Sequence, residues 1–274
     1  MSEEVLRFET IAEGVVEVQL NRPDKHNALN REMFTALAGA GERLAQHSGL
    51  RAVVLSGAGK SFCAGLDTSN FGRMAAGEGG GGPTSAARLA PRVHGDANLA
   101  QYTAMVWRDV PVPVIAAVQG VAFGGGLQVA LGADLRFAAP DARFSVMEIK
   151  WGLVPDMAGM VLLNELVRAD QARELCYSGR IVEAREAVEL GLATRLCDDP
   201  RSEALAYAKA LAGRNPDALR AMKRLLNQSA MPKQQAATVL QAESVEQDEL
   251  IGSPNQVEAV LANMQKRAPR FQDQ

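Results

Sequence analysis

Two short segments rich in small residues, about sixty residues apart, restrict what this chain can fold into more than any other feature. The first is residues 60–67, KSFCAGLD, and the second is residues 120–128, GVAFGGGLQ. Each follows an apolar, β-branched run, so each is predicted to lie where a strand ends. Glycine and alanine leave the backbone accessible there, because they place no bulky side chain in front of it. Two N–H groups aimed at one point from such segments would form an oxyanion hole.

The composition is that of an ordinary globular protein with a sizeable core. The chain has 274 residues, of which 47% are hydrophobic and 22% charged, and its formal net charge is −3. That charge gives no reason to expect nucleic acid or an anionic membrane as partner, and no apolar run is long enough for a transmembrane helix. The acidic N-terminus lacks a signal-peptide core. The scattered Cys63, Cys176 and Cys197 suggest reduced thiols rather than disulfides or a zinc site, so we expect a cytoplasmic enzyme without a metal.

Strand and helix signals alternate in the first half of the chain. Strands are predicted at 15–20, 52–55, 112–118 and 135–139. One helix is predicted to follow an N-cap at Asn30 and end near residue 46, and another to begin at Gly125. This alternation predicts an α/β fold with crossover helices.

The second half is predicted to be mostly helical after Pro155. The expected helices span 157–168, 171–177, 184–190, 201–214, 216–228, 233–250 and 253–266. A single strand is expected there, at 194–197. The glycine-rich segment 71–91 is predicted to be a surface loop that is poorly ordered without ligand and forms a wall of the site.

Several ordered landmarks together resemble one family. They are Asn21-Arg22-Pro23 with Asn27-Ala28-Leu29, residues 59–67, 120–126, Ala133-Asp134, 144–155, 184–188 with Gly191-Leu192, and Lys266-Arg267 near Phe271. Over nearly the whole chain this pattern is similar to the crotonase superfamily, the enoyl-CoA hydratase/isomerase family. The resemblance implies an α/β fold with a crotonase-like ββα spiral core in residues 1–200. It also implies a helical C-terminal extension in 201–274 that serves oligomerisation and CoA contact, and a homotrimer or dimer of trimers.

The resemblance implies acyl-CoA chemistry through an enolate. The thioester oxygen would lie between the backbone N–H groups of Leu66 and Gly125. The physical interpretation agrees, because Gly125 opens a predicted helix whose positive dipole end would face the developing oxyanion.

Three positions of the family pattern carry the acid and base groups. At the first, hydratases often have Glu and this chain has Gln128. At the second, Glu148 is retained. At the third, hydratases often have Gly and this chain has Asp156. A glutamine cannot exchange a proton at neutral pH, whereas Glu148 and Asp156 can if burial raises a pKa. We therefore expect double-bond isomerisation rather than hydration. Hydration, with Glu148 as base and Gln128 as water holder, remains an alternative, as does Asp156 as a helix N-cap.

The resemblance also implies where coenzyme A would bind, as part of the thioester substrate and not as a separate cofactor. The expected contacts are Lys25, His26, Ala28, Lys60, Ala64 and Asp67, with Lys266 and Phe271 reaching the CoA of a neighbouring subunit. A non-catalytic acyl-CoA-binding protein is the alternative from another class. A serine peptidase of related fold is set aside, because no histidine pairs with a serine in a recognisable pattern. Trp107 and Trp151 are expected in the core or pocket wall.

Overall fold

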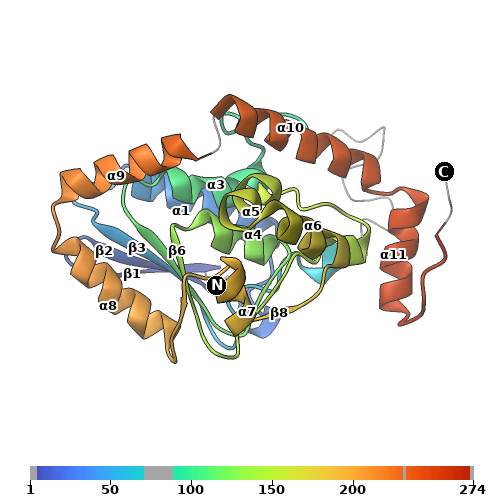
Figure 1. The fold of residues 1–274 in the computed structure, drawn as a ribbon, viewed down its shortest axis with the longest axis horizontal. Helices are drawn as coiled ribbons and strands as arrows, with labels where there is room; N and C mark the ends of the chain where they lie inside the picture. Colours follow the sequence, from blue (N-terminus) through green and yellow to red (C-terminus); the bar gives the residue numbers. More distant parts are fainter. Residues whose placement is uncertain (1–4, 71–88, 231–232, 272–274) are drawn as a thin grey trace.

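The computed structural model describes residues 5–70, 89–230 and 233–271, and its centre is a six-stranded sheet (Figure 1). The strand order is β1-β2-β3-β4-β6-β9, with β1 antiparallel to β2 and the other pairs parallel. The strands are β1 (Leu6–Ala12), β2 (Val15–Leu20), β3 (Ala52–Gly57), β4 (Val114–Val118), β6 (Leu135–Ala138) and β9 (Arg195–Leu196). Apart from Gln19, β2, β3 and β4 are buried along their whole length, as expected for parallel strands covered on both faces.

Helices cover both faces of this sheet (Figure 1). One face packs against α1 (Arg31–Ala45), α3 (Leu99–Asp109) and α4 (Gly125–Gly132), in the larger hydrophobic core. The other face packs against α8 (Pro200–Ala212), through the fully buried Ala204 and Ala208. This helix therefore contributes to the core, although it opens the segment 201–274 that the sequence suggested as an extension.

A second, three-stranded sheet lies next to the first and leads into the site. Its order is β5 (Val121–Phe123), β7 (Arg143–Ser145) and β8 (Val182–Glu183). The remaining elements are the 3₁₀ helices η1 (Pro23–Lys25) and η2 (Glu148–Trp151) and the helices α5 (Gly159–Leu166), α6 (Ala169–Ser178), α7 (Ala184–Leu190), α9 (Pro216–Ser229), α10 (Lys233–Leu250) and α11 (Pro254–Met264). α9 and α10 run along one side of the molecule, and α11 lies at its end (Figure 1).

The expected α/β class is confirmed, and most predicted elements are present. The Asn30 side chain caps α1 by accepting from the Met33 N–H. The strand predicted from residue 112 begins only at Val114, because Pro113 has no N–H for the ladder and Val114 N–H binds the Asp134 carboxylate at 2.7 Å. The prediction of a single strand after Pro155 is wrong, since β8 is also present.

The predicted loop at 71–91 lies mostly outside the described residues, which resume at Leu89. In the part of the chain that is described, no helix is long and apolar enough to cross a membrane.

Candidate active site

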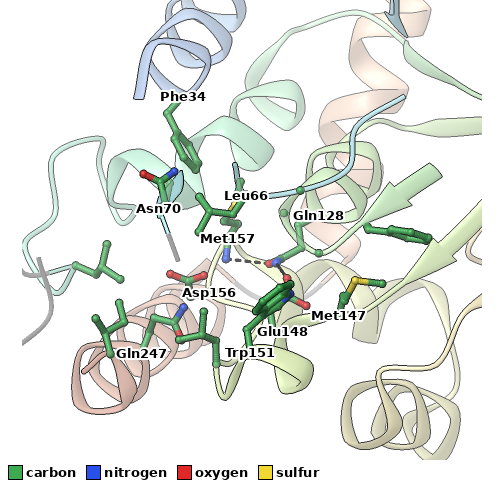
Figure 2. A pocket seen from close by; sticks show the side chains of 18 of the residues that line it. Phe34, Leu66, Asn70, Gln128, Met147, Glu148, Trp151, Asp156, Met157 and Gln247 are labelled. Atoms are coloured by element: carbon green, nitrogen blue, oxygen red, sulfur yellow. Dashed lines mark hydrogen bonds between the residues drawn. The ribbon is translucent and has the colours of Figure 1, made fainter. Parts of the chain in front are cut away.

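A cavity of about 450 Å³ opens between the two small-residue segments, η2 and the end of α10 (Figure 2). Its wall is mostly apolar and carries two carboxyl groups, those of Glu148 and Asp156, and three amides, those of Asn70, Gln128 and Gln247, besides Arg31 and Thr68. The lining residues also include Phe34, Ala64, Gly65, Leu66, Leu89, Leu99, Phe123, Gly124, Gly125, Met147, Trp151, Leu153, Met157 and Ile251. An apolar cavity with a few convergent polar groups is the usual form of a small-molecule site.

The two small-residue segments lie against each other, as the sequence suggested. Cys63 N–H donates to Val121 O at 3.0 Å, and Phe123 N–H donates to Cys63 O at 3.1 Å. The contact leaves no room for side chains, because a Cβ at Gly126 would lie 2.3 Å from Cys63 O. Gly65 has a φ of +89°, and a Cβ there would lie 2.6 Å from Phe123 O and 3.6 Å from Gly125 N.

The backbone N–H groups of Leu66 and Gly125 are suited to bind an oxyanion. Leu29 forms a β-bridge with Leu66, in which Leu29 N–H donates to Gly65 O and Leu29 O accepts from Asp67 N–H. This bridge does not use the Leu66 N–H. Gly125 is the first residue of α4, where an N–H has no acceptor within the helix. Both residues line the cavity, where the two small-residue segments meet.

Glu148 is a buried carboxyl group with one oxygen hydrogen-bonded and the other without a partner among the described residues. It is 8% exposed, and Oε1 accepts from Gln128 Nε2 at 2.7 Å. Oε2 is buried and has no hydrogen-bond partner among the described residues. Burial raises the pKa of Glu148 to about 7; the neighbouring Asp156 adds to the shift and the Gln128 hydrogen bond opposes it. This carboxyl group can therefore take or give a proton near neutral pH.

Gln128 is held at both ends of its amide. Its Nε2 donates to Glu148, and its Oε1 accepts from Met157 N–H at 2.9 Å (Figure 2). The same oxygen packs against Gly159, where a Cβ would lie 2.5 Å away. The side chain is 3% exposed. Gln128 therefore orients Glu148 and offers no open acceptor to a water molecule.

Asp156 lies on another part of the cavity wall, in the turn before α5 (Figure 2). The N-cap of α5 is Ala158, with a φ of +65°, so the interpretation of Asp156 as the N-cap is wrong. Burial raises the pKa of Asp156 to about 7; the nearby Asp248 adds to this shift, and a hydrogen bond from Gln247 opposes it. Asp156 is thus a second carboxyl group able to hold a proton near neutral pH.

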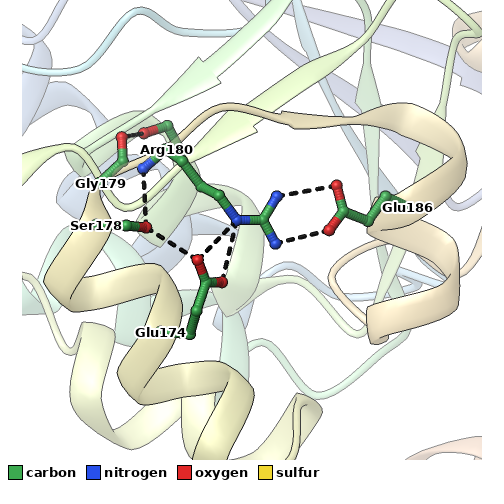
Figure 3. A network of polar contacts seen from close by, with 6 residues as sticks. Glu174, Ser178, Gly179, Arg180 and Glu186 are labelled. Carbon is green, nitrogen blue, oxygen red and sulfur yellow. Dashed lines mark hydrogen bonds and ion pairs between the residues drawn. The ribbon is translucent and has the colours of Figure 1, made fainter.

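A polar network centred on Arg180 joins the end of α6 to α7 (Figure 3). Arg180 binds Glu186 at 2.6 Å and Glu174 at 2.9 Å, which fixes the end of α6 against α7. The neighbouring Gly179 carbonyl accepts from Ser145 Oγ at 2.8 Å, at the end of the strand that precedes η2. Through Gly179 the network contacts Ser145, three residues before Glu148. Its residues do not line the cavity.

The residues expected to contact CoA are mostly outside the cavity. Of them, Ala64 lines it, whereas Lys25, His26 and Lys60 are exposed. Ala28 is buried, and its carbonyl accepts from the Arg22 guanidinium. The lining also excludes Asp67, which pairs with Arg22 at 2.9 Å, and Lys266 and Phe271, which are exposed beyond α11.

We expected no histidine next to a serine, and that expectation is wrong. His26 Nδ1 and Ser61 Oγ lie 3.0 Å apart. Ser61 is only 3% exposed and does not line the cavity, so it is not placed to attack a substrate. Within the described ranges, no group of three or more His, Cys, Asp or Glu side chains is placed to hold a metal ion.

Sequence reasoning missed several residues around the site. Phe34 of α1 lines the cavity, as do Met147 and Met157. Glu243 of α10 binds the turn that carries Asp156. No local pattern could have indicated this contact, because it joins residues 85 positions apart. Trp107 is fully buried in the core and Trp151 lines the cavity, as expected.

The comparisons with known proteins agree with one another. The profile of the family described as enoyl-CoA hydratase/isomerase matches residues 10–274. A probable enoyl-CoA hydratase, echA6 of Mycobacterium bovis, is 34% identical over 263 residues, 96% of this chain and 98% of that protein. A human mitochondrial Δ(3,5)-Δ(2,4)-dienoyl-CoA isomerase is 33% identical over 226 residues, 81% of this chain and 68% of that protein. The crystal structure of an enoyl-CoA hydratase/isomerase from Pseudoalteromonas atlantica T6c superimposes with a TM-score of 0.83 at 31% identity, covering 98% of this chain and 100% of that one.

Proposed function

The chain belongs to the enoyl-CoA hydratase/isomerase family, and from that premise we propose that it moves a double bond in an unsaturated acyl-CoA thioester. Membership and the crotonase fold make it an acyl-CoA enzyme, a lyase or an isomerase. One observation carries the finer proposal. Glu148 lines the cavity and has one oxygen without a hydrogen-bond partner among the described residues, its neighbour at position 128 is an amide, and the second carboxyl group of the cavity wall is Asp156.

The proposed reaction uses these groups in turn. The thioester oxygen accepts the N–H groups of Leu66 and Gly125. Glu148 removes a proton from carbon, and the C–H electron pair moves through the conjugated system onto the oxygen, giving an enolate. Asp156 donates a proton to a different carbon, the electron pair returns from the oxygen, and the double bond has moved. One C–H bond is broken and one is formed, so no water and no redox partner is consumed.

Hydration is the second candidate, favoured by relatives named as hydratases at similar identity. Its syn form needs a water held between two groups, one accepting and one donating a proton. Glu148 Oε2 offers one open acceptor, whereas the Gln128 oxygen is already bound by Met157 N–H. That arrangement supports isomerisation over hydration.

The test compares the purified protein on 2-enoyl-, 3-enoyl- and 3,5-dienoyl-CoA substrates. Isomerisation leaves the mass unchanged and changes the ultraviolet absorbance, whereas hydration adds the mass of one water. Rapid hydration of 2-enoyl-CoA with no double-bond shift would overturn the preference. Binding of acyl-CoA with neither reaction would favour the non-catalytic alternative.

The pH dependence of kcat/KM is expected to be bell-shaped with its maximum near pH 7. Glu148 must be ionised and Asp156 protonated, and burial raises both pKa values to about 7.

Asp156→Asn removes a charge that raises the pKa of Glu148, so the pKa of Glu148 should fall. Carbon-13 NMR titration of labelled glutamate in both proteins measures this; an unchanged or higher Glu148 pKa would contradict the coupling.

Gln128→Glu is expected to raise hydratase activity on a 2-enoyl-CoA. The new carboxyl group would lie about where Gln128 Nε2 contacts Glu148, at 2.7 Å, so the two would share one proton and supply both an acid and a base. Adding Asp156→Gly should increase hydration further and remove isomerisation. Coupled assays of both reactions check this. If wild-type protein hydrates rapidly and Asp156→Gly changes neither activity, Asp156 has no catalytic role.

The assembly is proposed to be a homotrimer or a dimer of trimers. The helical segment 201–274 presents apolar residues without a partner in the single chain: on α9, Met222, Leu225 and Leu226 are 49%, 64% and 68% exposed. We further propose that Lys266 and Phe271, which are exposed beyond α11, reach the CoA of a neighbouring subunit. Lys25, His26, Ala28, Lys60 and Asp67 are proposed to border the CoA on the outside of the cavity mouth. Sedimentation equilibrium should give three or six times the chain mass, and a monomer at micromolar concentration would contradict both assignments.

A further inference from the structure

Glu243 is a buried carboxyl group to which the reaction above gives no role. It lies on the face of α10 that packs against α5, and it is 4% exposed. A carboxylate is rarely buried to this extent unless hydrogen bonds compensate for the loss of water. The groups that bind it therefore indicate what it does.

Three N–H donors converge on this carboxylate. Met160 N–H donates to Oε1 at 2.8 Å, and Ala158 N–H donates to Oε2 at 3.0 Å. The Gln101 side-chain amide, from α3, donates to Oε2 at 3.2 Å. Burial raises the pKa of Glu243 to about 8, while these donors favour the ionised form.

Two of these donors belong to the turn that carries Asp156. This turn ends in Ala158, whose φ of +65° is disfavoured for a residue with a side chain. Ala158 is the N-cap of α5 and has no capping side chain of its own. Glu243 supplies that function from another helix, because its carboxyl oxygens accept the Ala158 and Met160 N–H groups.

The same face of α10 holds the chain on the other side of Asp156. Gln247, one helical turn after Glu243, accepts from Val154 N–H at 3.0 Å and donates to the Asp156 carboxyl group. α10 thus binds the backbone before and after Asp156. Gln128 holds the same turn from the Glu148 side, at Met157 N–H.

We propose that Glu243 is a positioning residue, a proposal that rests on the proposed function. Its carboxyl group fixes the backbone at 156–160 and so places Asp156 on the cavity wall, where Asp156 can exchange a proton with the substrate. Glu148 is held by Gln128 and by η2, and the turn reaches it only indirectly, through the Met157 N–H bond to Gln128, so it depends less on Glu243 than Asp156 does. Loss of Glu243 should therefore affect the step that needs Asp156 more than the step that needs Glu148 alone.

The experiment compares wild type, Glu243→Gln and the control Glu246→Gln, which changes an exposed glutamate of the same helix. Two rates are measured in deuterium oxide: double-bond shift, which needs both carboxyl groups, and exchange of a substrate hydrogen for deuterium, which needs one. Glu243→Gln should slow the shift roughly tenfold or more, because a misplacement of about 1 Å can cost on the order of 100-fold. Isotope exchange should stay within about threefold of wild type, because Glu148 and the oxyanion donors are untouched.

Backbone amide exchange, followed by mass spectrometry of peptides covering 155–164, gives a readout independent of catalysis. Glu243→Gln should accelerate it roughly threefold to tenfold at Ala158 or Met160, because the glutamine amide nitrogen that replaces one carboxyl oxygen cannot accept an N–H. Glu246→Gln should match wild type in every measurement.

Unchanged amide protection in Glu243→Gln, or equal slowing of both substrate reactions, would overturn the proposal. A wild-type protein with neither substrate reaction would refute the proposed function instead, and amide exchange would still decide whether Glu243 holds the turn. Asp156→Asn separates these cases further: it should lose the double-bond shift while leaving the amide protection of 158–160 as in wild type.

Discussion

Replacing Glu148 by glutamine is expected to lower turnover on the true substrate by on the order of 10²–10⁴-fold, the usual contribution of a general base. The substitution keeps the shape of the side chain and the contact with Gln128, but it removes the group that accepts the proton. The effect should fall on kcat rather than KM, because the cavity wall and the oxyanion donors remain in place.

Stability should not account for that loss. Glu148 is buried with one oxygen unpartnered, so a neutral amide is expected to be tolerated at least as well as the ionised carboxylate. Thermal unfolding of Glu148→Gln is compared with wild type and with Glu189→Gln, an exposed glutamate on α7. Unchanged turnover in Glu148→Gln would show that another residue is the base, and Asp156 would be the first to examine.

Gly65→Ala is expected to produce the second largest effect, a loss of roughly 10²–10³-fold in kcat, as when one oxyanion donor is removed. Gly65 precedes Leu66 and has a φ of +89°, and an alanine Cβ would lie 2.6 Å from Phe123 O. The backbone must move to relieve this clash, and the movement displaces the Leu66 N–H from its place beside Gly125. Steady-state kinetics and inhibition by an enolate-like acyl-CoA analogue should both show the loss.

Gly14→Ala is the matched control for strain. Gly14 has a φ of +71°, a Cβ there would lie 2.6 Å from Gly49 O, and the residue is far from the cavity in the turn between β1 and β2. Both variants should lose stability, about 1–2 kcal/mol for the left-handed conformation alone. Only Gly65→Ala should slow turnover at a temperature where both remain folded. Equal kinetics in the two variants would remove Leu66 from the oxyanion site.

Local pattern was enough to predict the parts of the site that depend on strand ends. The small-residue segments and the helix beginning at Gly125 follow from backbone geometry, which the sequence encodes over a few residues. Glu148, Gln128 and Asp156 were identified from the family pattern, and burial of a carboxyl group was only a condition for its raised pKa.

Local pattern could not predict contacts between residues that are far apart in the sequence. Asp156 was weighed as a helix cap from its position before a helical run, but Ala158 takes that place and the acceptors come from Glu243. The contact between His26 and Ser61 joins two loops whose approach depends on the folded sheet. Short strands such as β5, β7 and β8 have too few residues to show an alternating pattern.

The bonds from Glu243 to Ala158 and from Gln247 to Val154 span 85 and 93 residues. A chain emerging from the ribosome folds from its N-terminus, so the sheet and the oxyanion segments can assemble well before α10 has been synthesised. The turn that carries Asp156 must wait for that helix. In a chain that folds during its synthesis, the placement of Asp156 is therefore among the last features of the site to be completed, together with the part of the cavity wall that α10 supplies.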